Sequence, residues 1–409
     1  MKRLIIVASL AILAVGCQKT FVQNEVQTPI GFSTEVGKQT RAIVDGTTYD
    51  TNQPFGVYAY GHQGANDPAP SEIMVNVEIF KDGNDWKATD GFTYYWPNDP
   101  ETTINFYAYS PVLNTASNQK NQAGEVSLAS HLVMEANDFE HSEDDGLSFT
   151  GYIHSNPYVD FMEATPIEGA TFSNPDGEAT GTSLINGQVP LTFNHKMTQV
   201  VFNVTTDKVY KGVTFTLKNI TLKNVKDKGS YSNGDWTSAF SVNEVASRRI
   251  YTVFPADSDN GADLTDRTLA NDATLEADVV LQYAADATQK LNWTSVGVTM
   301  IPQDMATATT NPTVGADSYV NETDAQMFAI EYVISGKGVA TETVIKHVPF
   351  LVTGSTAVNW GPNKKIIYNV QIGLKEITFD PEVATWSNTY DHDDDDDTPE
   401  VSTDTEVNI

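Results

Sequence analysis

The residue best suited to covalent chemistry is Cys17, the only cysteine in a chain of 409 residues. A single thiol excludes an intrachain disulfide, a zinc site built from several thiolates and an iron–sulfur cluster. Cys17 follows the apolar run Leu4–Val15, which itself follows Lys2 and Arg3. A basic start, a short apolar run and a small residue before the break predict a secretory signal peptide over residues 1–16. This run is too short to cross a bilayer as a helix.

The segment Leu13–Cys17 reads LAVGC and resembles a bacterial lipobox, in which the cysteine thiol receives a diacylglycerol. Lipoboxes more often carry Leu three residues before the cysteine, where this chain has Ala14. The alternative is an ordinary signal peptide followed by an unmodified cysteine. We expect lipidation at Cys17, and contact with the membrane only through that lipid. Several acyl chains on one residue would give stable attachment.

No other part of the sequence carries a recognisable catalytic or metal-binding pattern. There is no nucleophile elbow, P-loop, zinc-protease motif or dinucleotide-binding fingerprint, and the seven histidines show no metal-ligand spacing. We expect His195 to be structural, hydrogen-bonded at a strand edge. Acidic clusters at 140–145, 257–261 and 393–397 are typical of solvated turns and linkers. The sequence therefore predicts no cofactor, no metal and no enzyme, although two carboxylates paired only by folding would escape notice.

Charge excludes one class of partner. The chain has 24 Lys and Arg against 54 Asp and Glu, for a formal net charge of −30. So acidic a surface repels phosphates, which excludes nucleic acid and argues against electrostatic docking on anionic lipid. Hydrophobic residues make up 40% of the chain, which is enough to form packed cores.

A strand with a basic residue just after it is expected near the N-terminus. In this strand, mainly apolar residues alternate with small and polar ones. The residues of the mainly apolar face are Ile30, Phe32, Thr34 and Val36. Arg41 follows the strand and is the only arginine in residues 4–247. A cut between Arg41 and Ala42 would therefore remove one strand and no more. The alternative is an incidental exposed arginine in a linker.

The strand pattern continues to about residue 375, as short aromatic and β-branched runs separated by Gly, Asn, Asp and Pro. This pattern predicts an all-β protein built from sandwiches. We expect a lipidated propeptide with the first strand at 17–41, an N-terminal domain at 42–186 and a C-terminal domain at 187–386. Residues 387–409 are expected to form an acidic linker and a candidate strand.

Two segments near the C-terminus could pair with another chain as strands. The first has on one face Ile377, Phe379, Val383 and Thr385. The second follows the acidic run, and its β-branched face consists of Val401, Thr403, Thr405, Val407 and Ile409. A free strand exposes a ladder of hydrogen-bonding groups, so such a segment is suited to pairing. Plain disorder is the alternative for 401–409.

In order and spacing, a series of short motifs resembles the fimbrillin family of Bacteroidales, the type V pilins, over nearly the whole chain up to Trp386. Each motif alone is unspecific. They are IGFST (30–34), TRA (40–42), FGVYAY (55–60), YWP (95–97), FYAYSP (106–111), VDFM (159–162), LTFNH (191–195), MIPQ (300–303), WGPNK (360–364) and ITF (377–379).

The resemblance implies a lipoprotein precursor at the outer membrane that an arginine-specific protease cuts between Arg41 and Ala42. The cut would release the lipid and the first strand, and the C-terminal strand of another subunit would fill the groove left behind in an extracellular fimbria. The implied fold is two tandem transthyretin-like β-sandwiches. The implied partners are other fimbrial subunits, the protease and a host or bacterial adhesion receptor. We expect this chain to be a shaft or accessory subunit, and the alternative is a tip subunit.

The alternative function is a surface glycan-binding lipoprotein of the outer membrane. Tyr94–Pro97 and Trp236 could stack on sugar rings. However, aromatic side chains in short strands are more often part of a sandwich core. This alternative also requires that the lipid on Cys17 is kept permanently.

Overall fold

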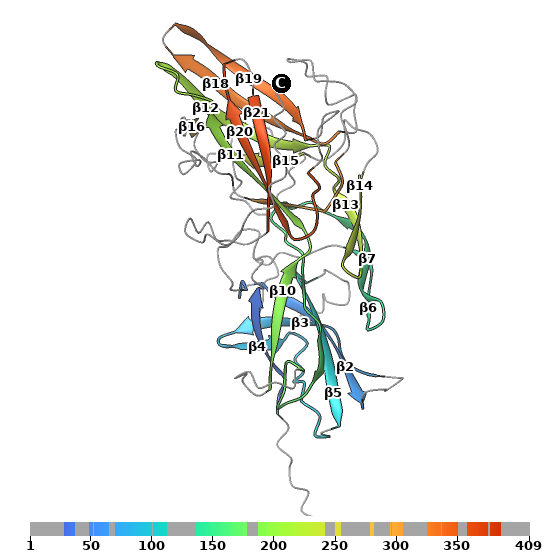
Figure 1. Cartoon of the computed structure of the whole chain (residues 1–409). Helices are drawn as coiled ribbons and strands as arrows, with labels where there is room; N and C mark the ends of the chain where they lie inside the picture. Colours follow the sequence, from blue (N-terminus) through green and yellow to red (C-terminus); the bar gives the residue numbers. More distant parts are fainter. Residues whose placement is uncertain are drawn as a thin grey trace, which may run out of the picture.

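A computed structural model gives the fold of the chain (Figure 1). It describes residues 28–36, 49–51, 53–64, 70–99, 101–112, 136–177, 187–241, 250–254, 279–281, 295, 297–305, 325–336, 338–350, 358–374 and 377–385. Every regular element in these ranges is a strand, which confirms the all-β fold class. Within the same ranges no helix is long and apolar enough to span a membrane.

Eight strands form the N-terminal sheet. They are β1 (Gly31–Val36), β2 (Phe55–Gln63), β3 (Ser71–Asp82), β4 (Asp85–Ala88), β5 (Thr102–Ser110), β8 (Met162–Ala164), β9 (Ile167–Ala170) and β10 (Gln188–His195). Their spatial order is β1, β10, β8, β5, β2, β3 and β4, with β9 paired to β5. The two ends of this order, β1 and β4, lie in contact. The sheet therefore curls around its own apolar core.

The core of the N-terminal sheet follows from the alternation of its strands. In β10, Val189, Leu191 and Phe193 are fully buried, while the residues between them are partly exposed. Side chains two apart share one face of a strand, so these three point into the same core. Strand β2 is buried on both faces because Tyr58 and Tyr60 belong to a second core on the other side of the sheet.

That second core is shared with a four-stranded middle sheet. Its strands are β6 (Asn137–Ser142), β7 (Gly146–Ile153), β13 (Lys228–Ser232) and β14 (Asp235–Ala239), in the order β14, β13, β7 and β6. A two-residue turn joins β13 to β14, with φ of 46° at Asn233 and 94° at Gly234. Asn-Gly is the preferred pair for a tight hairpin turn that needs positive φ at both central residues.

Two further sheets enclose the C-terminal core. One consists of β17 (Val298–Met300), β11 (Thr198–Thr206), β20 (Lys364–Ile372) and β21 (Ile377–Thr385), in this order. The other consists of β15 (Tyr251–Phe254), β12 (Val213–Lys223), β18 (Met327–Gly336) and β19 (Val339–Pro349), with β16 (Val279–Leu281) paired to β12. The ring of Phe202 in β11 lies 5.1 Å from Phe328 in β18, so the two sheets share one core.

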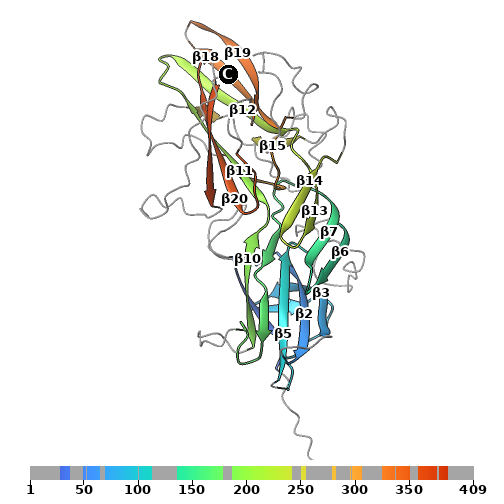
Figure 2. The same cartoon turned by 45° about the vertical axis from the view of Figure 1, so that its right-hand side comes forward.

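The sheets are arranged along one long axis (Figures 1 and 2). The N-terminal sheet lies at one end, the C-terminal pair at the other and the middle sheet on the flank between them. Strand β10 pairs with β1 and β8, and β13 pairs with β7. The division expected after residue 186 therefore precedes a strand that belongs to the N-terminal sheet.

Candidate functional site at the edge strand β1

Strand β1 lies at the end of the N-terminal sheet, and β10 is its ladder partner. The two strands are parallel, and their register runs from Gly31 opposite Gln188 to Val36 opposite Phe193. The amide of Gly31 donates to the carbonyl of Gly187 over 2.8 Å. A parallel edge strand is covalently joined to its partner only through a long connection, here more than 150 residues. Backbone hydrogen bonds and side-chain packing therefore position β1.

The inward face of β1 is apolar and closes the N-terminal core. Phe32 is 6% exposed and Val36 is 2% exposed. The ring of Phe32 meets Phe55 at 5.8 Å and Phe106 at 6.1 Å, both edge to face. Such aromatic pairs add to the stabilisation from burial. Ile30, Phe32 and Val36 all belong to this core, whereas Thr34, the fourth residue of the predicted face, is only partly buried.

The two ends of β1 are fixed by polar contacts. At the start, the Ile30 amide donates to the carbonyl of Tyr94 (2.8 Å), and the Trp96 amide donates to the carbonyl of Thr28 (3.0 Å). On the outward face, the Thr192 hydroxyl donates to Oε1 of Glu35 over 2.8 Å. These contacts fix the register of β1 against both neighbours.

Sequence reasoning missed the residues that receive β1. Phe55 and Phe106 contact Phe32, and the Trp96 indole donates to the carbonyl of Gly187 over 3.1 Å. Period-two alternation could have marked Phe55 and Phe106 as core residues. It could not have shown that they face β1.

Several predicted site residues lie outside the described ranges. They are Cys17, Arg41, Ala42, Val401, Thr403, Thr405, Val407 and Ile409. Of the predicted site, the structure places the strand at residues 30–36 and the first C-terminal segment, β21.

Strand β21, the first candidate for pairing with another chain, is bound within the C-terminal half. It pairs antiparallel with β20, from Ile372 opposite Ile377 to Lys364 opposite Thr385. Ile377 is buried, and Val383 packs against the C-terminal core. Like β1, it is the last strand of its sheet. The structure therefore does not bring β21 and β1 of one chain together.

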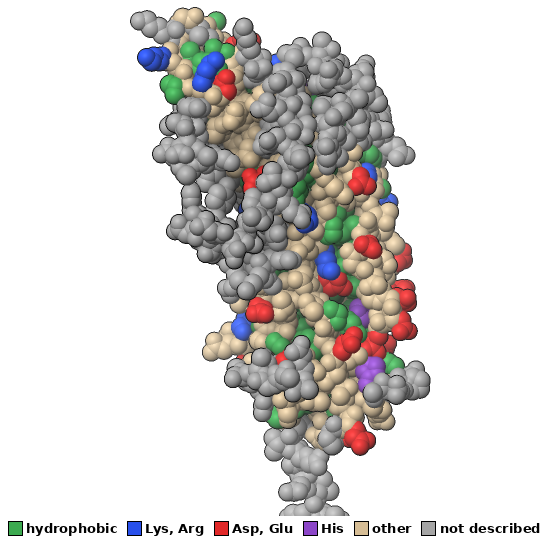
Figure 3. All heavy atoms as spheres, viewed as in Figure 1, with side chains coloured by type: hydrophobic (Ala, Val, Ile, Leu, Met, Phe, Trp, Pro, Cys, Tyr) green, Lys and Arg blue, Asp and Glu red, His purple; other side chains and the backbone are tan. Residues whose placement is uncertain are grey.

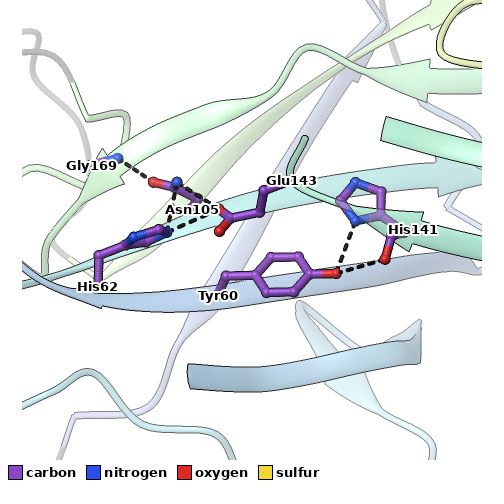
Figure 4. Close-up of polar contacts among 6 residues, drawn as sticks. All are labelled: Tyr60, His62, Asn105, His141, Glu143 and Gly169. Carbon is purple, nitrogen blue, oxygen red and sulfur yellow. Dashed lines mark hydrogen bonds and ion pairs between the residues drawn. The ribbon is translucent and has the colours of Figure 1, made fainter. Parts of the chain in front are cut away.

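A polar cluster lies where the N-terminal sheet meets the β6–β7 hairpin (Figure 4). The Nε2 atom of His62 lies 3.0 Å from Oε1 of Glu143, and Asn105 donates to the same oxygen over 2.8 Å. The hydroxyl of Tyr60 lies 3.0 Å from Nδ1 of His141, and burial lowers the pKa of His141 to about 4. These contacts attach the hairpin to the sheet, so we assign the cluster a structural role.

The other residues considered for chemistry are also structural. His195 is buried in β10, with Nδ1 2.5 Å from Oδ2 of Asp160. Trp96 is buried in the N-terminal core, and Trp236 packs against the middle one. In the part of the chain that the structure describes, no three His, Cys, Asp or Glu side chains come together as a metal site.

The described elements define an all-β protein whose first described strand, β1, lies at the edge of its sheet. The sequence pattern of the family described as Fimbrillin-like matches residues 40–386. The chain therefore belongs to the fimbrillin-like family, as the short motifs predicted. Members of this family are fimbrial structural proteins of the cell surface and not enzymes.

Solved structures give more distant similarities. A fimbrial protein from Bacteroides vulgatus is 16% identical over 88% of this chain and 99% of its own, with a TM-score of 0.49. The tip fimbrial protein Mfa3 from Porphyromonas gingivalis is 11% identical over 86% and 99%, with a TM-score of 0.30. A fimbrial assembly protein from Parabacteroides distasonis is 11% identical over 88% and 99%, with a TM-score of 0.28. No curated protein matches the chain. The family assignment rests on the sequence match, since these scores are below 0.5.

Proposed function

We propose that this chain is a pilin that reaches the outer membrane as a lipoprotein anchored through Cys17. An arginine-specific protease cuts between Arg41 and Ala42, and the released subunit polymerises by strand exchange into an extracellular fimbria. Its place is the shaft or an accessory position, with the tip as the alternative. We further propose that the sheets belong to two tandem transthyretin-like sandwiches. The family match supports a fimbrial role for the chain.

The observation that carries this proposal is the position of β1. Its inward side chains fill part of the N-terminal core, yet it lies at the end of the sheet and pairs with β10 alone. After a cut at Arg41, only noncovalent contacts would hold β1 in place. Its departure would uncover the rings of Phe55 and Phe106 and the free edge of β10.

Such a slot is a receptor for an extended segment. Main-chain hydrogen bonds to the free edge supply affinity, and pockets for alternate side chains supply specificity. A hydrophobic pattern on one face of the incoming strand fixes its register, because a slip of one residue would turn every apolar side chain outward. The natural occupant is a strand from another fimbrial subunit.

The first test is the protease site. We expect an arginine-specific protease to cut the purified precursor after Arg41 and produce a ladder of polymers on size-exclusion chromatography and gels. Arg41→Lys keeps the charge and removes the site, so it should remain monomeric. Lys38→Ala is the matched control and should polymerise like the wild type. Equal polymerisation of the Arg41→Lys variant, with an uncut N-terminus by mass spectrometry, would refute the mechanism.

A further inference from the structure

The hairpin of β6 and β7 is attached to the N-terminal sheet through one face of β6. Side chains two apart share a face of a strand, and this face consists of Phe139, His141 and, just after the strand, Glu143. Each of the three contacts β2 or β5, and Figure 4 shows His141 and Glu143 reaching toward that sheet. Asp138 and Glu140, on the other face of β6, are exposed. The attachment therefore consists of one aromatic ring and two titratable groups.

The main-chain pairing of β6 adds little to this attachment. Strand β6 is the last strand of the middle sheet, and among the described strands it pairs with β7 alone. That pairing is irregular, because the register shifts between Asn137 and Glu140 and Asp138 has a φ of 48°. Segments of this kind open locally at a lower free energy than the whole protein unfolds. The side chains on the inward face of β6 therefore determine whether it stays closed.

Tyrosine rings enclose His141 on this face. Its imidazole stacks on Tyr58 at 4.8 Å and on Tyr60 at 5.6 Å, and the ring of Tyr107 lies 4.5 Å away. The Tyr60 hydroxyl lies 3.0 Å from Nδ1 of His141 and donates to the His141 carbonyl over 3.1 Å. Since the hydroxyl has one hydrogen, Nδ1 carries the imidazole hydrogen and donates to the hydroxyl oxygen. A second proton would go to Nε2, for which no described residue supplies a hydrogen-bond acceptor.

We propose that the β6–β7 hairpin is an acid-sensitive latch, in which protonation of His141 opens β6 and uncovers the outer face of β2 and β5. Protonation places a charge between the tyrosine rings and adds an N–H group without an acceptor. A buried charge of this kind is unfavourable. In the opened hairpin the imidazolium is hydrated instead. This inference does not depend on strand exchange at β1.

Burial and a nearby carboxylate act on His141 in opposite directions. Burial lowers its pKa to about 4 from 6.5, and Glu143 opposes this shift. Glu72 and Glu168 act on the tyrosines that enclose the imidazole. The titratable groups packed around this face of the hairpin are Tyr58, Tyr60 and His62 on β2, Glu72 on β3, Tyr107 and Tyr109 on β5, Glu168 on β9 and Glu143 in the turn. Burial is the largest effect, so the closed hairpin keeps His141 neutral at a pH where an open hairpin would protonate it.

The face that β6 covers consists mainly of tyrosine. Tyr58 lies opposite Tyr107 in the ladder of β2 and β5, and Tyr109 lies opposite Gly56. Phe139 of β6 packs on this face, with its ring 5.0 Å from Tyr109 and 6.1 Å from Tyr58. Figure 3 shows acidic and histidine side chains on the flank that the hairpin forms. Opening would add exposed aromatic rings to this flank, and exposed apolar patches are typical of contact surfaces.

Hydrogen–deuterium exchange of the full chain at pH 7 and pH 5 tests the latch. After correction for the intrinsic pH dependence of exchange, we expect the opening constant of residues 139–142 to rise about twentyfold at pH 5. This rise follows from the pKa of His141 being about 4 in the closed hairpin and 6.5 in the open one. Residues 364–372 of β20 are the internal control and should show no such rise. Equal protection of residues 139–142 at both pH values would overturn the proposal, because Glu143 and the tyrosine faces would then hold the imidazolium in the closed hairpin.

Three substitutions identify the titrating group. His141→Gln cannot titrate, so its opening constant should be the same at both pH values. Glu140→Gln removes a carboxylate from the exposed face of the same strand, so it is the matched control and should keep the wild-type response. His62→Gln should also keep this response. If His62→Gln abolishes the response and His141→Gln retains it, His62 is the switch and the proposal is wrong.

A direct titration covers the case in which His141→Gln does not fold. NMR titration of the wild-type imidazoles should give a pKa of about 4 for His141. A pKa of 6.5 or above in a hairpin that stays closed would overturn the proposal. These measurements use the uncleaved chain, so their outcomes are separate from those that test cleavage at Arg41 and polymerisation.

Discussion

Phe32 links the alternating sequence of β1 to the stability of the N-terminal core. Its ring is enclosed by two aromatic neighbours, Phe55 and Phe106, and only 6% of the residue is exposed. The next residue, Ser33, lies in the same strand but faces solvent. The two positions therefore separate the effect of packing from the effect of strand pairing.

Truncating Phe32 should destabilise the uncleaved chain. We expect Phe32→Ala to lower the free energy of unfolding by about 3 kcal/mol, because it removes a buried ring and leaves a cavity. Ser33→Ala should change it by less than about 0.5 kcal/mol, as is usual for exposed positions. Denaturant unfolding of the full chain measures both. Similar effects of the two substitutions would contradict the packing described for β1.

Protonation of His141 should make the stability of the folded chain depend on pH. Burial lowers the pKa of this imidazole to about 4 from 6.5, with Glu143 opposing the shift. The unfolded chain binds the proton more readily, so this group's contribution to stability is present above pH 6.5 and is lost as the pH falls toward 4. His141→Gln cannot titrate and should lose less Tm than the wild type between pH 7 and pH 5. Equal losses in the two proteins would contradict the burial of His141.

At the scale of one element, β1 protects the edge of β10. A chain beginning at Ala42 lacks β1, so residues 188–193 of β10 lose the strand with which they pair. We expect the amides of β10 to exchange with deuterium faster in monomers of this chain than in the precursor. Residues 364–372 of β20 are the internal control and should be unchanged. Equal protection of β10 in both chains would show that β1 does not cover it.

Local alternation was sufficient to predict the strand at residues 30–36. Period-two patterns are set by neighbours in the sequence, and both β1 and β10 show them clearly. Their pairing could not be predicted, because a parallel partner more than 150 residues away leaves no local signal. The same limit explains why β10 was expected in the C-terminal domain. The composition change near residue 187 was visible, but the sheet that β10 joins was not.

For the molecule as a whole, the net negative charge determines how copies of the chain can associate. Removing residues 1–41 would change the formal net charge from −30 to −33, since five basic and two acidic side chains leave. Copies with this charge repel each other over about a Debye length, roughly 8 Å at physiological ionic strength. Nonspecific aggregation is therefore disfavoured, and stable association needs short-range contacts of the kind found around β1.

The direction of β1 has a mechanical consequence. The strand runs parallel to β10, which lies along the long axis of the molecule (Figure 1). A segment from another copy seated in that slot would lie along the line through successive copies. Tension applied along that line would load the ladder hydrogen bonds in shear, so that they resist together instead of opening one after another. A filament joined in this way would withstand pulling far better than peeling.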